Sequence, residues 1–277
     1  MNLRNALEYG KQILLSANIP DGANDAWLLL SHVTGITRAA YFMDAERELT
    51  EEQEQDYKGA LQKRQSRIPL QHITGEQEFM GLCFIVNEHV LIPRQDTEIL
   101  VEEVLAHAKP KSTVLDMCTG SGCIAVSLSK YGEELQVVAA DISKEALIVA
   151  KENGKAQGVA VSFLQSDLFE NVQGTYDVIV SNPPYIPTNV IEQLEAEVKL
   201  HDPMQALDGK EDGLYFYRKI IAESPKYLKN QGTLFFEIGH DQGADVSLLM
   251  REAGFEHVTV KKDLAGLDRV VFGVYNT

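Results

Sequence analysis

The sequence has few cysteines, a single tryptophan and fewer basic than acidic side chains among its 277 residues. Its three cysteines, Cys83, Cys118 and Cys123, have neither metal-ligand nor redox spacing, so we expect reduced thiols and a cytoplasmic protein. The seven histidines form no ligand-like cluster, and we expect no metal. No apolar run approaches the length of a membrane span, and residues 1–20 lack the apolar block of a signal peptide.

The scarcity of positive charge bears on the class of partner. Lysine and arginine number 25 against 41 aspartates and glutamates, which gives a net charge of −16. Residues 1–72 carry only −2 of this charge, and the rest of the chain carries −14. Clustered lysine and arginine side chains dominate the affinity for a phosphate backbone, so this charge balance disfavours a stable nucleic-acid partner. It does not exclude a local basic groove. We expect a monomer that contacts no membrane.

The first quarter of the chain has the pattern of a helical bundle. Leu3, Leu7 and Leu14 recur at helical spacing, and Thr50–Gln53 forms a capping box at the start of a further helix. No strand-like alternation interrupts this pattern. We therefore assign residues 1–74 to a small bundle of four or five helices.

The pattern changes to strands in the next segment. Apolar residues alternate between 76 and 93, which predicts two short strands with a turn near Asn87-Glu88. We assign residues 75–94 to a β-hairpin linker. A helix then follows, capped by Asp96 or Thr97.

Strands and helices alternate from Ser112 onward, and we assign residues 95–277 to this second domain. Such alternation predicts an α/β fold of the Rossmann-like type, with a seven-stranded, mostly parallel sheet covered by helices on both faces. The last two strands have no helix between them, which predicts an antiparallel edge pair. The predicted strands cover residues 113–117, 136–141, 161–167, 176–182, 232–239, 255–263 and 268–275.

A glycine-containing loop follows the first strand of the predicted sheet. We call Asp116–Gly122, which reads DMCTGSG, the glycine loop. Gly120 and Gly122 permit a tight turn and let a ligand approach the backbone. Asp141 ends the next strand, where its carboxylate can accept hydrogen bonds from both hydroxyls of a ribose. This pattern also satisfies the dinucleotide motif G-x-G-x-x-A, so the loop alone does not distinguish between NAD and S-adenosylmethionine as the cofactor.

The stretch VSNPPYIP, residues 180–187, distinguishes these cofactors. We call its central residues Asn182, Pro183, Pro184 and Tyr185 the acceptor clamp. Two prolines stiffen the loop and leave its carbonyls free to accept hydrogen bonds, and the Asn182 side chain adds another acceptor oxygen. Tyr185 adds an aromatic surface for a planar group. The alternative interpretation is a Pro-Pro turn that only ends the strand.

The acceptor clamp suits a planar NH₂ group. The Asn182 side-chain oxygen and the Pro183 carbonyl can accept its two N–H bonds, which directs the nitrogen lone pair toward a sulfonium methyl group held by the glycine loop. Positioning then supplies much of the catalysis, and no strong base is needed. A nicotinamide enzyme needs a proton donor or acceptor beside a carbinol, and no such group stands out in the sequence.

The sequence resembles the release-factor glutamine methyltransferase family over essentially its full length. The matching segments are RIPLQHITGEQEF, LIPRQDTEILV, LDMCTGSGCIAVSL, AADIS, QSDLF, VSNPPYIP and FFEIG. This resemblance implies a class I S-adenosylmethionine-dependent methyltransferase domain. It also implies N5-methylation of the glutamine in the Gly-Gly-Gln motif of peptide chain release factors. The helical bundle carries neither the glycine loop nor the clamp, so we expect it to supply the remote contacts of substrate recognition.

The resemblance assigns residues to both ligands. The acceptor clamp holds the glutamine amide, with Asp167 and Leu168 beside the adenine of the cofactor. The implied cofactor residues are Asp116, Cys118, Thr119, Gly120, Ser121, Gly122, Asp141, Ile142, Asp167, Leu168 and Asn182. Cys118 is a departure, because the family usually has a glycine there, and we interpret it as a small packed residue rather than a nucleophile.

Several residues near these motifs have two interpretations. Arg94, Asp96, Thr97 and Glu98 match the family pattern and could cover the site, but an ordinary capped helix start explains Asp96 and Thr97 equally well. Glu237 ends a predicted strand on the ligand side of the sheet, where a plain strand-end carboxylate is the simpler interpretation.

Three other functions remain as alternatives. An amino methyltransferase acting on adenine would use the same clamp, but it needs a flipped base and a basic groove. A non-catalytic adaptor would keep the fold and bind no cofactor. An NAD-dependent dehydrogenase is the third alternative.

Overall fold

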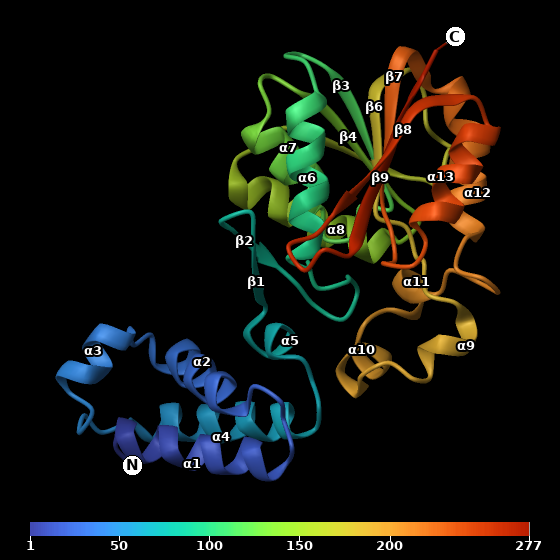
Figure 1. Ribbon diagram of the computed structural model, residues 1–277. Coiled ribbons are helices and arrows are strands. Elements are labelled where there is room, and N and C mark those ends of the chain that lie inside the picture. The colour runs from blue at the N-terminus through green and yellow to red at the C-terminus, as the bar shows by residue number, and fades with distance from the viewer. Residues whose placement is uncertain (277) are drawn as a thin grey trace. The chain divides into compact units, whose positions relative to one another are not determined.

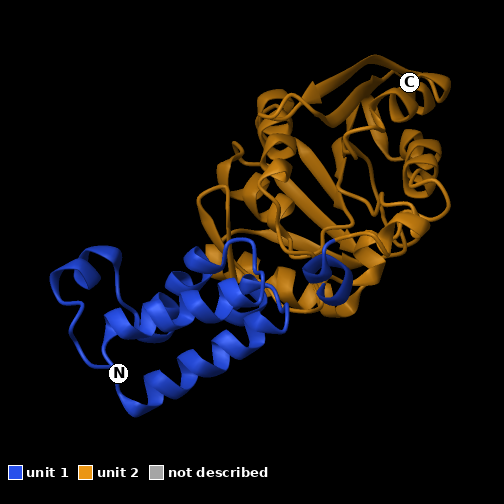
Figure 2. Ribbon diagram, turned by 60° about the horizontal axis from the view of Figure 1, so that its bottom comes forward, with its two compact units in different colours: residues 1–75, 195–201 blue, residues 76–194, 202–277 orange. Residues whose placement is uncertain are grey.

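The computed structural model describes residues 1–276, which divide into two compact units (Figure 2). Unit 1 comprises residues 1–75 and 195–201, and unit 2 comprises residues 76–194 and the chain from residue 202 onward. The segment predicted as a hairpin linker groups with unit 2, and a short helix from the second half of the chain groups with unit 1. None of the helices within residues 1–276 combines the length and the hydrophobicity needed to cross a bilayer.

Unit 1 is helical, as the sequence predicts. Its helices are α1 (Leu3–Ser16), α2 (Gly22–Thr34), α3 (Arg38–Met43), α4 (Glu51–Gln65), α5 (Leu70–Thr74) and α10 (Ala196–His201). The capping box at the start of α4 is confirmed, because Gln53 N donates to the Thr50 hydroxyl and Thr50 N donates to the Gln53 side chain. Buried Tyr57 donates to Ala26 O at 3.0 Å, and a side chain at Gly10 would collide with its hydroxyl.

A buried arginine joins α10 to the other helices of unit 1. Arg64 Nε lies 2.7 Å from Asp25 Oδ2, and both side chains are 8% exposed. Arg64 and Arg67 each lie 3.2 Å from Glu197 Oε1 on α10. Removing one partner of a buried ion pair leaves an uncompensated charge, so these contacts fix α10 within unit 1.

Unit 2 begins with a hairpin of β1 (Glu76–Phe79) and β2 (Leu82–Ile85). Its turn is Met80-Gly81, with φ of 52° and 70°, so the prediction of a turn near Asn87-Glu88 was wrong. Two successive positive φ values give the backbone twist that joins antiparallel strands. The Asn87 side chain instead accepts from His89 N in a turn that does not join two strands.

The main sheet of unit 2 has seven strands in the order β5-β4-β3-β6-β7-β9-β8 (Figure 1). Five strands are parallel, and β9 is antiparallel to both β7 and β8, which confirms the predicted fold class. Helices α6 (Asp96–His107), α7 (Cys123–Tyr131) and α8 (Lys144–Gln157) cover one face, and α12 (Tyr215–Glu223) and α13 (Gly243–Glu252) cover the other (Figure 1). The strands are β3 (Thr113–Met117), β4 (Gln136–Asp141), β5 (Val161–Gln165), β6 (Tyr176–Ser181), β7 (Leu228–Glu237), β8 (Phe255–Lys262) and β9 (Asp268–Tyr275).

Some element boundaries differ from the predictions. Helix α6 begins at Asp96 with no side-chain cap, so the prediction that Asp96 or Thr97 caps it was wrong. Strand β7 begins at Leu228, before the predicted start of this strand at residue 232. The segment between β6 and α12 contains α9 (Thr188–Ile191), α10 and α11 (Met204–Leu207), none of which the sequence pattern predicted.

Candidate functional site

A pocket of about 440 Å³ lies at the carboxyl ends of β3, β4 and β6, and residues of unit 2 form all of its lining. Parallel strands end at the same edge of a sheet, which is where open α/β folds bind ligands. The sequence-predicted residues on its wall are Cys118, Thr119, Gly120, Ser121, Asp141, Ile142, Asp167, Leu168, Asn182 and Pro184. Asp116, Gly122, Pro183 and Tyr185 are not among the residues that line the pocket.

The glycine loop has left-handed backbone conformations at three positions. The φ values are 63° at Cys118, 54° at Gly120 and 79° at Gly122. A Cβ at Gly122 would lie 3.0 Å from the Ala150 side chain, so this glycine allows α8 to pack closely. A Cβ at Gly120 would meet nothing within 4 Å, and Gly120 lines the pocket. Gly120 therefore leaves bare backbone accessible to a ligand.

Asp116, the first residue of the glycine loop, stabilises the rest of the loop by hydrogen bonds. Its carboxyl is fully buried, and Oδ2 accepts from the Thr119 hydroxyl at 2.5 Å and from Ala125 N at 3.2 Å. Its Oδ1 atom has no partner among residues 1–276. Burial raises the pKa of Asp116 to about 7, against the lowering effect of these hydrogen bonds. Asp116 thus supports the glycine loop without forming part of the wall.

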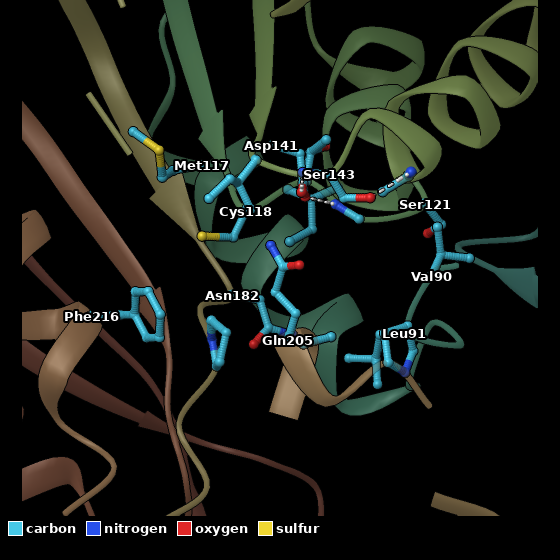
Figure 3. A pocket seen from close by; sticks show the side chains of 18 of the residues that line it. Val90, Leu91, Met117, Cys118, Ser121, Asp141, Ser143, Asn182, Gln205 and Phe216 are labelled. Atoms are coloured by element: carbon cyan, nitrogen blue, oxygen red, sulfur yellow. Dashed lines mark hydrogen bonds between the residues drawn. The ribbon is translucent and has the colours of Figure 1, made fainter. Parts of the chain in front are cut away.

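Asp141 joins the end of β4 to the glycine loop. Its Oδ2 accepts from Gly120 N at 2.8 Å, and its Oδ1 accepts from Ser143 N at 2.9 Å (Figure 3). Burial raises its pKa, while the backbone N–H groups of Gly120 and Ser143 lower it. Each carboxylate oxygen can accept a second hydrogen bond, so a ligand hydroxyl can still bind Asp141.

The acceptor clamp is held by contacts that the sequence pattern did not reveal. Buried Gln242 donates from Nε2 to Tyr185 O at 3.0 Å, and its Oε1 accepts from Gly239 N at 2.9 Å. A Cβ at Gly213 would collide with the same Tyr185 carbonyl. The side chain of Gln242 therefore fixes the backbone of the clamp, and Gly213 leaves the space that this contact requires.

The carboxyl of Glu237 lies next to the clamp. Strand β6 pairs with β7 so that Ser181 is opposite Phe236, which brings Asn182 and Glu237 together at the edge of the sheet. The side chains of Thr97 and Asn182 are near enough to the Glu237 carboxyl to affect its pKa. Burial raises its pKa to about 7, against the lowering effects of Thr97, Arg269 and Asn182.

The residues for which the sequence allowed two interpretations make different contacts. Arg94 lines the pocket and lies 2.7 Å from buried Asp202, immediately before α11. Burial raises the pKa of Asp202 to about 6, although Arg94 lowers it. Asp96 pairs with Arg269 at 3.1 Å, outside the wall. The Glu98 carboxylate accepts from Met80 N at 2.6 Å, so Glu98 fixes the hairpin turn.

Several residues that line the pocket were not predicted, and Gln205 is one of them. Gln205, on α11, lines the same cavity and lies beside Asn182 in the view of Figure 3. The contacts on both sides of α11 hold it there, because Arg94 binds Asp202 and Ile186 N donates to Leu207 O at 3.0 Å. No motif in the sequence identifies Gln205, since α11 has only four residues.

Solved structures align with a large part of this chain. A methyltransferase from Pyrococcus furiosus aligns with a TM-score of 0.55 and 17% identity, covering 72% of this chain and 91% of that chain. The Thermus thermophilus 16S rRNA N2 G1207 methyltransferase RsmC, in complex with AdoMet and guanosine, aligns with a TM-score of 0.51 and 16% identity, covering 73% of this chain and 50% of that chain. These similarities establish a methyltransferase fold.

Sequence comparisons extend over both units. Residues 5–75 match the family model of the PrmC N-terminal domain, and residues 94–207 match that of the methyltransferase small domain. The release factor glutamine methyltransferase of Geobacter sulfurreducens is 39% identical over 272 residues, covering 98% of this chain and 96% of the relative. The protein of the same name from Bacillus cereus is 40% identical over 281 residues, covering 98% and 99%. The chain therefore belongs to the release factor glutamine methyltransferase family.

Proposed function

We propose that this enzyme transfers a methyl group from S-adenosylmethionine to the side-chain amide nitrogen of the glutamine in the Gly-Gly-Gln motif of peptide chain release factors. The proposal is supported by one pocket whose wall contains residues of both the glycine loop and the acceptor clamp. A cofactor and a planar amide can therefore meet in one cavity, and 440 Å³ is within the range of small-molecule sites.

The residues present fit S-adenosylmethionine. The open space beside Gly120 accepts a ligand against the backbone, and Asp141 retains acceptor capacity for ribose hydroxyls. Half-exposed Ile142 and the pair Asp167-Leu168 provide the surface for the adenine. When bound, this cofactor supplies an electrophilic methyl group on a positively charged sulfur. The full set proposed to hold it is Asp116, Cys118, Thr119, Gly120, Ser121, Gly122, Asp141, Ile142, Asp167, Leu168 and Asn182.

The acceptor clamp holds the glutamine amide in this proposal. The Asn182 side-chain oxygen and the Pro183 carbonyl accept the two N–H bonds of the amide, and the Tyr185 ring packs against its plane. Prolines 183 and 184 restrict the loop, and Gln242 holds the Tyr185 carbonyl. The nitrogen is thus oriented before the reaction, and orientation lowers the barrier without a strong base.

The two units have different roles in this proposal. The pocket lies in unit 2 alone, whereas unit 1 provides the surface that selects a release factor over abundant free glutamine. Remote contacts of this kind supply binding energy that positions the reacting group. The near-neutral charge of residues 1–72 suits a protein surface better than nucleic acid. We further propose that the enzyme works in the cytoplasm as a monomer.

Transfer of a radiolabelled methyl group tests the proposal. The enzyme is incubated with labelled S-adenosylmethionine and either a purified release factor or nucleic acid, and label is counted in each. We expect label in the release factor only. Label in nucleic acid would favour a base methyltransferase, and label in neither, without cofactor binding, would favour an adaptor.

A further inference from the structure

Glu237 occupies an unusual position for a carboxylate. It is the last residue of β7, it is 2% exposed, and its Oε2 atom has no close hydrogen-bond partner among residues 1–276. Its backbone is fixed, because the buried Tyr217 hydroxyl donates to Glu237 O at 2.9 Å. A buried carboxylate with spare acceptor capacity is costly to a fold, so Glu237 calls for a functional explanation.

The neighbours of this carboxylate connect it to the pocket. Thr97 and Asn182 both line the pocket, and their side chains lie close enough to the Glu237 carboxyl to lower its pKa as hydrogen-bond donors. An ionised carboxylate only accepts, so Asn182 must use its Nδ2 group here. The Oδ1 atom of Asn182 is then left to accept from a ligand. Without such a partner, the two ends of an asparagine amide are nearly equivalent in shape, and the side chain can turn over.

We propose that Glu237 is a positioning residue that holds the Asn182 amide with its oxygen directed toward the substrate glutamine. This proposal rests on the function proposed above and adds a residue that does not itself touch the substrate. A reversed Asn182 amide would present N–H donors to the N–H bonds of the glutamine, and the clamp would fail.

The proposal gives catalysis a dependence on pH. Ionised Glu237 accepts from Asn182, whereas protonated Glu237 can donate to Asn182 Oδ1 and favour the reversed amide. The pKa of about 7 places this change near neutrality, so turnover should rise as the pH increases through that value. The charged and titratable groups that face Glu237 come from several elements: Asp96 on α6, Cys123 on α7, Tyr185 after β6, Tyr217 on α12 and Arg269 on β9.

The first test measures kcat from pH 6 to 9 at saturating S-adenosylmethionine, with a release factor as substrate, for the wild type and Glu237→Gln. We expect a rise near pH 7 in the wild type. In Glu237→Gln we expect kcat to be about tenfold lower at pH 8, the usual cost of replacing a charged acceptor by a neutral one, and the rise to be absent. Calorimetric binding of S-adenosylmethionine should be unchanged, which verifies folding. An unaltered kcat and pH profile in Glu237→Gln would overturn the proposal.

Thr97→Val provides a second variant of nearly the same shape. Loss of the Thr97 hydroxyl removes a donor that lowers the pKa of Glu237, so the rise in kcat should move to higher pH. Asp116 also has a pKa of about 7. If the rise persists in Glu237→Gln and does not move in Thr97→Val, it belongs to another group such as Asp116, and the proposal fails.

A double-mutant cycle separates positioning from general support of the fold. If Glu237 acts through Asn182, Glu237→Gln should cause no further loss of turnover in the Asn182→Ala background. An equal loss in both backgrounds would contradict the proposal. A wild-type enzyme that methylates no release factor would instead refute the proposed function, so the two failures are distinguishable.

Discussion

The two halves of the pocket are held by contacts of different range along the chain. In the glycine loop, Asp116 binds Thr119 three residues away, and Asp141 binds Gly120 21 residues away. In the acceptor clamp, Gln242 binds Tyr185 across 57 residues, and Glu237 at the end of β7 is the neighbour of Asn182 and of Thr97 on α6. The loop is thus a local structure of one strand–turn–helix unit, whereas the clamp depends on elements that only the fold brings together.

This difference predicts that substitutions can impair the acceptor clamp and the glycine loop separately. Asn182→Ala, in the clamp, should cause the largest loss of turnover. Loss of the side-chain oxygen removes the orientation of the glutamine amide, so turnover should fall at least about a hundredfold. Binding of S-adenosylmethionine, measured by calorimetry, should stay nearly intact because the other ten residues proposed to hold the cofactor are unchanged. Asn189→Ala, at an exposed asparagine of α9, is the control and should retain full activity. Near-normal turnover in Asn182→Ala would refute the clamp model.

Asp141→Ala should damage the other half. The change removes the acceptor of Gly120 N and the proposed acceptor of the ribose hydroxyls. We expect binding of S-adenosylmethionine to weaken by about 1.5–3 kcal/mol, the usual value for hydrogen bonds to a charged group. Calorimetry on the folded variant measures this directly, with Asp241→Ala at an exposed position as the control. Unchanged affinity would remove Asp141 from the cofactor site.

Gln242→Leu tests the long-range support of the clamp. The substitution leaves Tyr185 O and Gly239 N without their side-chain partner. Each buried polar group left unpaired lowers the free energy of unfolding by about 1–3 kcal/mol. We expect a lower melting temperature and a turnover reduced about tenfold, with cofactor affinity unchanged. Gln173→Leu, at an exposed glutamine, should change neither. A loss of cofactor affinity equal to the loss of turnover would show that the halves are not independent.

Cys118→Gly should have the smallest effect. A non-glycine residue in the left-handed region costs about 1–2 kcal/mol, and glycine costs about 0.5–1 kcal/mol through the unfolded chain. The net gain in the free energy of unfolding should therefore be below about 1 kcal/mol, with activity retained. Cys118→Ala keeps the strain and should be less stable than Cys118→Gly in chemical denaturation. If Cys118→Gly were the less stable of the two, packing of the thiol would outweigh backbone strain.

The glycine loop was predictable from the sequence because its contacts are local. A strand, a glycine turn, a helix and a strand-end acid recur within one unit, and the structure has Cys118, Gly120 and Asp141 in one wall. The seven-stranded sheet and its antiparallel edge followed from the alternation of apolar segments. The assignment of these residues to S-adenosylmethionine stays a prediction.

The support of the acceptor clamp could not be predicted in the same way. Thr97 matched a helix cap, yet the structure has it inside α6 and against Glu237. No sequence motif marks Gln242, and the need for glycine at position 213 is visible only from its proximity to the Tyr185 carbonyl. Gln205, next to Asn182 in the pocket, lies on a helix of four residues, which is too short to give a periodic signal. Tertiary contacts determine these positions, and a single sequence carries no trace of such contacts.

The most direct test of the central claim is tandem mass spectrometry of a release factor after incubation with the enzyme and S-adenosylmethionine. The claim is that the pocket of unit 2 methylates a glutamine side-chain nitrogen. It predicts that the Gly-Gly-Gln peptide gains one methyl group on the glutamine side chain, and that a release factor with glutamate at this position gains none. A methyl group on another residue, or on the glutamate variant, would contradict it.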